Sequence, residues 1–369
     1  MKIIPNTRPW FPKKMREEII QDINYVMSSG KLMLGKYANL IEKEYSKITS
    51  ANYSISITSA TAGLQIALKY IDIAGGEVLV PAASFITDVS SIQMEGGTPV
   101  LVDINPDTLT FDIEDLKKKL TQRTRAIIWV HLTGYIGSEY QKIQSFAREN
   151  GLFLIEDAAH AHGARIDGKV AGSLGDVGIF SFYPTKVITA GTGGILTTND
   201  KKLSDFARDI RLFGTNQITG EVSLQGSDWF LDEFRSSVGY RQTSYLLENL
   251  KRRREIAKIY LERLESSREF KCLNISKDNL PSWFQFPVFC HPELNANKLR
   301  NILTKNGVEC KPIYPPIHKE VLFRSLSQEG LKNSEETLER SICLPMYVNL
   351  TNSEIDIVIE RLFQAIDQQ

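Results

Sequence analysis

Short apolar runs alternate with amphipathic segments between about Ile55 and Asn199. The runs are rich in β-branched and aromatic residues, which favour β-strands. They are SISIT (54–58), EVLVP (77–81), TPVLVDI (98–104), RAIIWVH (125–131), LFLIED (152–157), VGIFSF (177–182) and GGILTT (193–198). Segments with apolar residues at helical spacing separate several of these runs, at 61–71, 113–120 and 139–150. Buried strands that alternate with helices predict an α/β fold, in which a large, mostly parallel sheet lies between two layers of helices.

The pattern changes after about Asn199, where helical stretches replace the alternation. Residues 243–268 carry many charges and predict a long helix with a solvated face that links two domains. The stretch 270–369 predicts a smaller α+β unit, with a strand at WFQFPVF (283–289). We therefore predict two domains. Residues 1–245 form an N-terminal segment and a large cofactor-binding domain, and residues 246–369 form the linking helix and a small C-terminal domain.

Composition narrows the class of protein. The chain has 369 residues with 44 basic and 44 acidic side chains, and this balance argues against a nucleic-acid partner. The N-terminal stretch lacks the apolar core of a signal peptide, and no apolar run reaches the roughly 18 residues of a membrane helix, so we expect a cytoplasmic protein. The four cysteines are far apart and form no CxxC pair, so we expect reduced thiols and no metal site.

Residues suited to binding and chemistry follow the ends of these strands, where open parallel sheets bind their ligands. Thr58 to Thr61 follow the first predicted strand and open a helix, whose N-terminal N–H groups favour an anion such as phosphate. Serine and threonine are also common N-cap residues, and this simpler role would give the same sequence.

Asp157 and Lys186 follow two later strands. Lys186 closes the run FSFYPTK, whose aromatic residues would desolvate its amine, lower its pKa and make it a nucleophile. Together with Phe85, Ser181 and the phosphate-type loop, these two residues match the needs of pyridoxal 5′-phosphate (PLP). PLP requires an amine for a Schiff base, an acid beside its pyridine nitrogen, a ring against its face and a cup for its phosphate.

The same residues lie in blocks that resemble the DegT/DnrJ/StrS family of PLP-dependent sugar aminotransferases. The likeness runs along nearly the whole chain and is densest over 81–200, above all in IEDAAHAHGA and GSLGDVGIFSFYPTK. The stretches ITSATAGLQIAL and CLPMYVNLT match more loosely. The resemblance implies the aspartate-aminotransferase-like fold (PLP fold type I) and a homodimer with shared active sites.

The resemblance also implies roles around the cofactor ring. Lys186 is the catalytic residue, which forms the Schiff base and moves protons. Asp157 pairs with the pyridine nitrogen, and Phe85 stacks on the ring. His160 replaces the glutamine that many members have near the ring's 3′-oxygen, and a histidine can donate the same hydrogen bond.

The phosphate end combines matches with departures. The resemblance assigns phosphate binding to Thr61, the backbone of Ala62 and Ser181. Where many members read GEGG, this chain has Thr192 in GTGG. In many members the partner subunit supplies an asparagine to the phosphate, from a motif that also contains an arginine. The corresponding stretch here is GSDWFLDEF, which has Asp228 at the asparagine position and Phe230 at the arginine position. A carboxylate that faced a phosphate would be repelled, so either Asp228 points elsewhere or the phosphate is held differently.

Three further residues are candidates for substrate contact: Arg8 in the N-terminal segment, Tyr183 just before the lysine, and His318 in YPPIH. Tyr183 and His318 also have ordinary alternatives, as a packed tyrosine and as an exposed loop residue. His131 ends a predicted strand and could line the site, or it could be a packed or hydrogen-bonded histidine. His162 is expected to have a structural role or to support the residues that line the site.

The resemblance implies the transfer of an amino group from an amino acid to a nucleotide-linked keto-sugar. Glutamate is the expected donor. Three alternatives stay open. The acceptor could be a keto-inositol or a keto-octulosonate. The chain could be a related dehydratase, against which Lys186 argues because such members have histidine there. It could also be a non-catalytic, PLP-binding regulatory relative.

Overall fold

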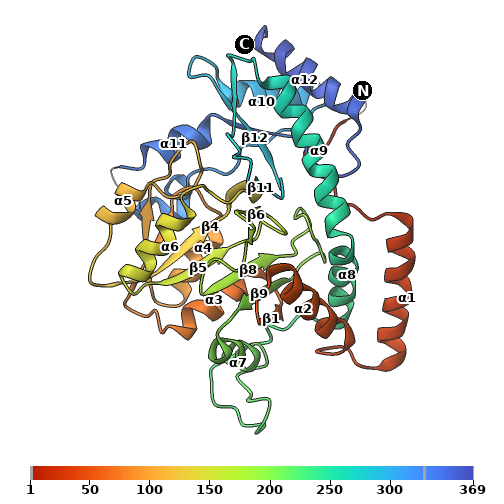
Figure 1. Ribbon diagram of the computed structural model, residues 1–369, viewed down its shortest axis with the longest axis vertical. Coiled ribbons are helices and arrows are strands. Elements are labelled where there is room, and N and C mark those ends of the chain that lie inside the picture. Colours follow the sequence, from red (N-terminus) through yellow and green to blue (C-terminus); the bar gives the residue numbers. More distant parts are fainter. Residues whose placement is uncertain (1–2, 327–329, 369) are drawn as a thin grey trace.

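A seven-stranded sheet lies at the centre of the computed structural model, which describes residues 3–326 and 330–368 (Figure 1). In spatial order its strands are β1 (Tyr53–Ile57), β9 (Gly194–Thr198), β8 (Val177–Ser181), β5 (Phe153–Asp157), β4 (Thr124–Val130), β2 (Glu77–Pro81) and β3 (Thr98–Val102). β9 pairs antiparallel with both β1 and β8, and the remaining neighbours pair in parallel. Each strand matches a predicted run to within a few residues, which confirms the α/β fold with its mostly parallel sheet.

Helices cover both faces of the sheet because the strands are apolar on both sides. One core unites the sheet with α3 (Ala60–Tyr70), α4 (Ile86–Met94) and α7 (Lys201–Ile210). The opposite core unites it with α2 (Lys36–Thr49), α5 (Ile113–Lys118) and α6 (Tyr140–Glu149). On β4, Ile128 belongs to the first core, whereas Ile127 and Trp129 belong to the second. The period of two along each strand therefore divides the apolar residues between two layers of helices.

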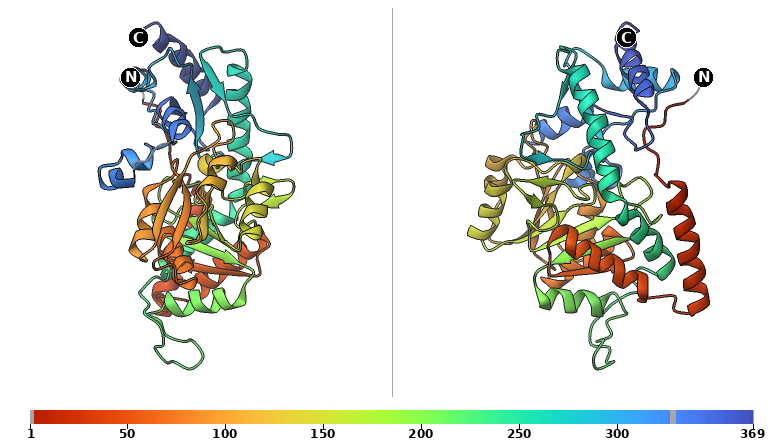
Figure 2. Two further views of the ribbon diagram at one scale, coloured as in Figure 1. Left: turned by 90° about the vertical axis from the view of Figure 1, so that its left-hand side faces the viewer. Right: turned by 45° about the vertical axis from the view of Figure 1, so that its right-hand side comes forward.

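Several elements lie outside these layers. α1 (Lys13–Ser29) packs against α8 (Glu233–Ser244) on one side of the molecule (Figure 2). A small sheet combines β6 (Arg165–Ile166), β7 (Lys169–Val170) and β11 (Asn279–Leu280), and a 3₁₀ turn, η1, spans Leu132–Gly134. Between α7 and α8 a long loop, residues 211–232, extends away from the body of the molecule (Figures 1 and 2).

A second sheet, fully antiparallel, forms the centre of the C-terminal part. Its strands are β10 (Phe270–Cys272), β12 (Phe286–Cys290) and β13 (Ser341–Leu344). A third core joins it to α9 (Leu246–Leu264), α10 (Ala296–Lys305) and α12 (Asn352–Ile366). The remaining elements are η2 (Ile317–Lys319), η3 (Val321–Leu326) and α11 (Lys332–Glu339). Ile4 also lies in this core and pairs with Val308, so part of the N-terminal segment packs here, and the domain boundary at residue 245 stays a prediction.

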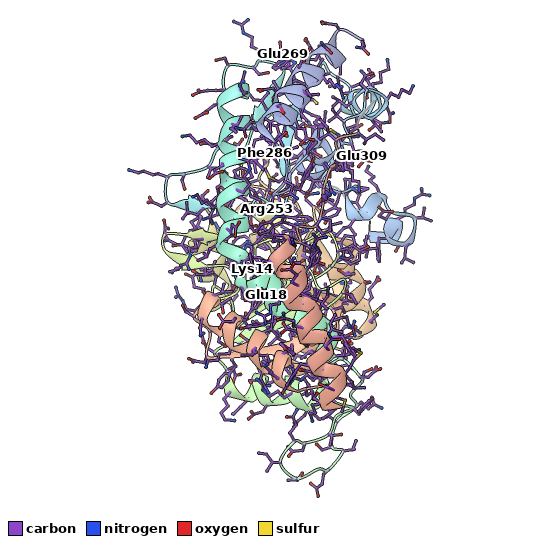
Figure 3. All side chains as sticks on the ribbon, turned by 90° about the vertical axis from the view of Figure 1, so that its right-hand side faces the viewer. Lys14, Glu18, Arg253, Glu269, Phe286 and Glu309 are labelled. Atoms are coloured by element: carbon purple, nitrogen blue, oxygen red, sulfur yellow. The ribbon has the colours of Figure 1, made fainter. Side chains whose placement is uncertain are left out.

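The long helix predicted at 243–268 is α9, which begins a few residues later, after the separate helix α8. Only one of its faces is solvated. Its buried face includes the guanidinium of Arg253, which donates to Asn249 Oδ1 and to the carbonyl oxygens of Trp283 and Met346 (Figure 3). These bonds tie the helix to the segments before β12 and after β13. In the described part of the chain, no helix has both the length and the apolar character that a bilayer requires.

Candidate active site

A cavity of about 340 Å³ opens at the carboxyl edge of the central sheet. The residues that line it come from segments far apart in the sequence, and they are Ser59, Ala60, Thr61, Leu64, Phe85, Thr87, Asp157, Ala159, His160, Ser181, Tyr183, Thr185, Lys186, Thr192, Gly193 and Tyr314. The cavity therefore lies where the topology of a parallel sheet places a ligand site.

The order of the strands brings these residues together. Ser59 follows β1 and Phe85 follows β2, while Asp157 and Ser181 are the last residues of β5 and β8. β9 runs in the opposite direction, so its beginning, next to Gly193, meets the ends of the other strands. Gly193 has φ 146°, in the region that favours glycine.

Lys186 presents its amine to an apolar and acidic environment. Its Nζ lies 4.6 Å from the centre of the Phe284 ring. Burial lowers the pKa of the amine to about 8, although the carboxyl groups of Asp157 and Asp88 act to raise it. With this pKa about a tenth of the amine is neutral at pH 7, against less than about one part in a thousand for a lysine with the usual pKa of about 10.4, so the side chain is a usable nucleophile.

Asp157 is the acidic counterpart of this amine in the cavity. It is 8% exposed, and its Oδ1 accepts a hydrogen bond from the N–H of Ala159 at 2.9 Å. Burial raises its pKa, while Lys186 and His131 favour its charged form. A second carboxyl, that of Asp88, is completely buried beside it.

The N-terminus of α3 forms one end of the cavity. Ser59 caps the helix, because its Oγ accepts a hydrogen bond from the Ala62 N–H at 3.1 Å. The predicted phosphate donor Ala62 is thus already bonded to the cap, and Ala62 does not line the cavity. Thr61 and Ser181 do line it, so two hydroxyl groups and a helix N-terminus face the same space.

Aromatic rings enclose the cavity from the sides. Phe85 is 44% exposed and lies 5.4 Å from Tyr314, measured between ring centres. His160 stacks on Phe284 at 4.1 Å, and its Nε2 pairs with the hydroxyl of Tyr314 at 3.0 Å. Burial lowers the pKa of His160 well below its usual range, so the ring is neutral. A neutral imidazole has one nitrogen that can donate a hydrogen bond to a ligand and one that can accept.

His162 supports the site from behind. Its Nε2 lies 2.9 Å from the carbonyl oxygen of Ser181, and its Nδ1 lies 2.7 Å from the hydroxyl of Tyr45. A carbonyl can only accept, so Nε2 carries the proton and Nδ1 accepts from the tyrosine. The predicted structural or supporting role of His162 agrees with these contacts, which fix the end of β8.

Comparison with known proteins identifies the family to which this fold and cavity belong. The chain matches the DegT/DnrJ/EryC1/StrS aminotransferase family over residues 13–363. It is a member of that family. The resemblance seen in the sequence blocks is therefore confirmed, as is the prediction that the chain is an aminotransferase.

Individual relatives cover almost the full length of this DegT/DnrJ/EryC1/StrS aminotransferase. A dTDP-3-amino-3,6-dideoxy-alpha-D-galactopyranose transaminase from Aneurinibacillus thermoaerophilus is 33% identical over 94% of this chain and 95% of its own. A GDP-perosamine synthase from Escherichia coli O157:H7 is 29% identical over 98% of each chain. The crystal structure of the aminotransferase TlmJ from Streptoalloteichus hindustanus matches with a TM-score of 0.92, at 28% identity over 99% of each chain. These likenesses confirm the predicted fold type I.

Two residues predicted for substrate contact, Arg8 and His318, do not line the cavity, and neither does the loop residue Asp228. Arg8 is exposed, and its positive charge acts to lower the pKa of Tyr347. His318 is buried and pairs with Glu335 at 2.7 Å, so it is not the exposed loop residue that one interpretation expected. Asp228 is exposed on the long loop of this single chain. In contrast, Tyr183 lines the cavity and is 57% exposed.

Sequence analysis also missed residues that the fold brings to this site. Tyr314 and Thr185 line the cavity, Phe284 lies beside the lysine amine, and Asp88 lies beside Asp157. Tyr314 is in the YPPIH stretch that drew attention to His318 instead. Its signal was an aromatic residue in a turn, which is too common a feature to mark a site by itself.

Proposed function

We propose that this chain is a PLP-dependent aminotransferase of amino-sugar biosynthesis, which transfers an amino group from an amino acid, glutamate in the first instance, to a nucleotide-linked keto-sugar. One observation carries the proposal. The half-buried amine of Lys186 and the carboxylate of Asp157 share a cavity with the N-terminus of a helix. The acceptor class is supported by the names of the relatives, which act on dTDP-linked or GDP-linked sugars.

The residues of the cavity fit PLP. An amine with a lowered pKa suits its aldehyde, and Asp157, with its second oxygen free of the Ala159 bond, suits a protonated ring nitrogen. The exposed ring of Phe85 suits stacking, and Thr61, Ser181 and the helix N-terminus suit the phosphate. When bound, PLP supplies an electron sink for the carbanion that forms at the substrate carbon.

The side chains of this chain would then handle the protons. Asp157 holds a proton at the ring nitrogen, because its charge next to that atom favours the protonated form. The amine of Lys186 would take a proton from the substrate carbon and return it, and its pKa of about 8 suits both directions near neutral pH. Phe85, Phe284 and Tyr314 limit the access of water to this exchange.

A homodimer is part of the proposal. The loop 211–232 extends from the body and exposes the apolar side chains of Phe213, Ile218 and Val222. Exposed apolar groups on a projecting loop are typical of a surface that another chain covers. In a homodimer Asp228, also on this loop, would approach the partner's site, where its charge would disfavour the phosphate of the cofactor. A cytoplasmic location stays a prediction.

Absorption spectroscopy tests the cofactor assignment. PLP added to the purified protein should produce a visible band that persists through gel filtration, and Lys186→Ala should abolish it. Lys186→Arg keeps the positive charge but not the nucleophile, and serves as the matched control that should also lack the band. Wild-type protein that gives no band with excess PLP would refute the proposal.

The donor and the acceptor follow from two screens. Glutamate should bleach the band of the wild-type protein, and a panel of nucleotide-linked keto-sugars should restore it with formation of the amino sugar. Restoration by keto-inositols or keto-octulosonates alone would favour those acceptors. A band that no amino acid changes would favour the non-catalytic regulatory alternative.

A further inference from the structure

Asp88 is a buried carboxyl group that the proposed function leaves without a role. It lies in the first turn of α4, is 0% exposed and does not line the cavity. Its Oδ2 accepts a hydrogen bond from the hydroxyl of Ser84, which is itself 1% exposed. Its Oδ1 receives no hydrogen bond from any N–H or O–H group among the described residues. A buried polar atom without a donor is costly, so this oxygen needs an explanation.

The explanation lies in the neighbouring carboxyl. A hydrogen bond between the side chains of Asp88 and Asp157 is among the causes that raise the pKa of Asp88 and lower that of Asp157, so the two carboxyl groups are direct neighbours. Two ionised carboxylates offer only acceptors, and two like charges in a buried site repel each other strongly. The contact becomes favourable when one of the two groups is protonated and donates to the other, as in other buried carboxyl pairs.

The surroundings decide which group holds the proton. Asp157 accepts the Ala159 N–H, and Lys186 and His131 both favour its negative charge. Asp88 is more deeply buried, and Ser84 is the residue that donates to it. Burial and the charge of Asp157 both raise the pKa of Asp88, and the hydrogen bond from Ser84 and the charge of Lys186 oppose them only in part. The proton therefore belongs to Asp88.

We propose that Asp88 is a protonated positioning residue, which donates a hydrogen bond to Asp157 and holds that carboxylate toward the cofactor ring. This inference rests on the proposed function, because it concerns the residue that would meet the ring nitrogen. A ligand that is itself held by a hydrogen bond keeps one orientation, and a donor behind it moderates its basicity. Asp88 would thus set both the direction of Asp157 and how firmly Asp157 holds the ring proton.

Two substitutions of Asp88 show whether it acts as a neutral hydrogen-bond donor or as a negative charge. Asp88→Asn keeps the shape, can still donate to Asp157 and can accept from Ser84, but it cannot ionise. Asp88→Leu keeps a similar volume and removes the donor. Ser91→Ala is the matched control, because Ser91 lies on the same helix, is 0% exposed and has an unpaired hydroxyl. Equilibrium binding of PLP and the pH titration of the visible band are measured for each variant.

If Asp88 is a neutral donor, the variants should fall in one order of PLP affinity. Asp88→Asn and Ser91→Ala should bind PLP within about twofold of the wild type and keep its pH titration, whereas Asp88→Leu should weaken binding about tenfold or more. The titrating groups near the pair, Lys186, His131 and Tyr314, are unchanged in all variants. If Asp88→Asn weakens binding or shifts the titration as much as Asp88→Leu does, Asp88 acts as an anion and the proposal is wrong. Unchanged binding by Asp88→Leu would also overturn it.

Infrared spectroscopy of the protein without cofactor gives an independent test, which also applies if Asp88→Leu does not fold. The wild type at neutral pH should show the carbonyl band of a protonated carboxylic acid, and Asp88→Asn should lack it. Absence of this band from the wild type would contradict the proposal. If wild-type protein shows the infrared band but never binds PLP, then the proposed function fails and the protonated Asp88 stands.

Discussion

Burial at the sheet edge is what gives single residues of this protein unusual acid–base properties. Lys186, Asp157, Asp88, His160 and His162 all have pKa values shifted toward their neutral forms, and burial is the largest cause in each case. Clusters of shifted groups beside a cavity are typical of active sites.

Acylation of Lys186 should depend on pH in a characteristic way. The rate of its reaction with a small acylating reagent should rise with pH and level off above about 8, because the neutral amine reacts. An ordinary lysine, with a pKa of about 10.4, continues to gain reactivity well above that value. Peptide mass spectrometry measures the rate in the protein without cofactor. Asp157→Asn should move the midpoint to lower pH, because the aspartate favours the ammonium form, and an upward movement would contradict this account.

His162 should make the protein sensitive to acid. Burial lowers its pKa from 6.5 to about 3, so the unfolded chain takes up a proton at pH values where the folded chain does not. The stabilisation by the neutral ring is complete above 6.5 and is lost as the pH falls toward 3. The free energy of unfolding should fall there by up to about 1.4 kcal/mol per pH unit from this residue alone. Urea unfolding at several pH values measures the slope, which His162→Gln should reduce and His291→Gln, at an exposed histidine, should not.

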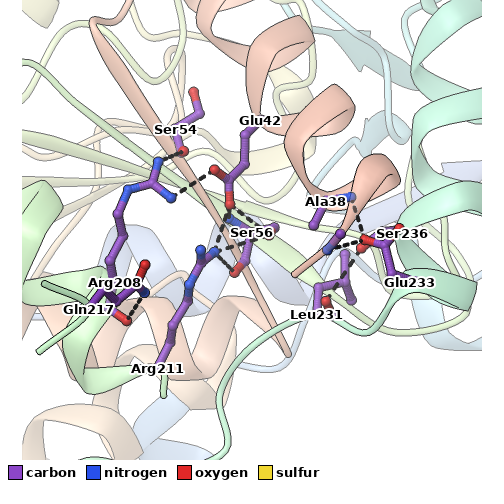
Figure 4. A network of polar contacts seen from close by, with 11 residues as sticks. Ala38, Glu42, Ser54, Ser56, Arg208, Arg211, Gln217, Leu231, Glu233 and Ser236 are labelled. Carbon is purple, nitrogen blue, oxygen red and sulfur yellow. Dashed lines mark hydrogen bonds and ion pairs between the residues drawn. The ribbon is translucent and has the colours of Figure 1, made fainter. Parts of the chain in front are cut away.

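Buried ion pairs and helix ends join the elements around the edge strand β1. Glu42 of α2 pairs with Arg211 at 2.7 Å and with Arg208 at 2.9 Å, and it also accepts from the N–H and hydroxyl of Ser56 in β1 (Figure 4). Glu233 of α8 accepts three backbone N–H groups at the beginning of α2, where the helix dipole favours a negative charge (Figure 4). Carboxylates thus connect α2 to the sheet at one end and to α8 at the other.

Loss of Arg211 should weaken this connection strongly. Arg211→Met leaves the buried carboxylate of Glu42 with one half-buried partner, so the free energy of unfolding should fall by about 3 kcal/mol. Arg208→Met is the matched control. The Arg208 side chain is 30% exposed, and solvent should limit the loss to about 1 kcal/mol. Chemical denaturation compares the two variants, and equal losses would show that burial is not the deciding factor.

Helices and strands could be predicted where the spacing of apolar residues along the sequence reflects which side chains are buried. The central strands are buried on both faces, so their apolar runs stood out and their ends fell within a few residues of the predicted ones. The reverse direction of β9 and the pairing of the short strands β6 and β7 could not be predicted, because which strands pair is decided by the tertiary structure and not by the local sequence pattern. Lys186, Asp157 and Phe85 were singled out because each lies at or after the end of a predicted strand, and the structure places all three in the lining of one cavity. Asp88 was missed because an acidic residue in the first turn of a helix has an ordinary explanation in the helix dipole.

The projecting loop 211–232 carries apolar side chains that the described part of its own chain leaves exposed, although Arg211 and Leu231 near its ends are buried. Ile218 is 94% exposed and Val222 is 71% exposed, although both are apolar. If the proposed homodimer covers them, the assembled molecule is the unit that binds cofactor, and the fold of one chain supplies only part of the site.

Charges on this loop should therefore separate the subunits. Light scattering should give a dimer for the wild type, and Ile218→Asp combined with Val222→Asp should shift it toward the monomer and weaken PLP binding. Leu322→Asp adds a charge at another apolar side chain, which is 77% exposed, and serves as the control. A doubly substituted loop that leaves the dimer intact would place the subunit contact elsewhere.

The pairing of β1 with β9 has a consequence for synthesis on the ribosome. β1 is among the first parts of the sheet to emerge, but β9, its partner in the sheet, follows about 140 residues later. At translation rates of roughly 5–20 residues per second, the nascent strand waits on the order of ten seconds with Ile55 and Ile57 unpaired. During that interval the edge that later positions Ser59 and Thr61 is an apolar segment open to chaperones. The delay before the edge strand is paired is thus set by the position of β9 in the chain.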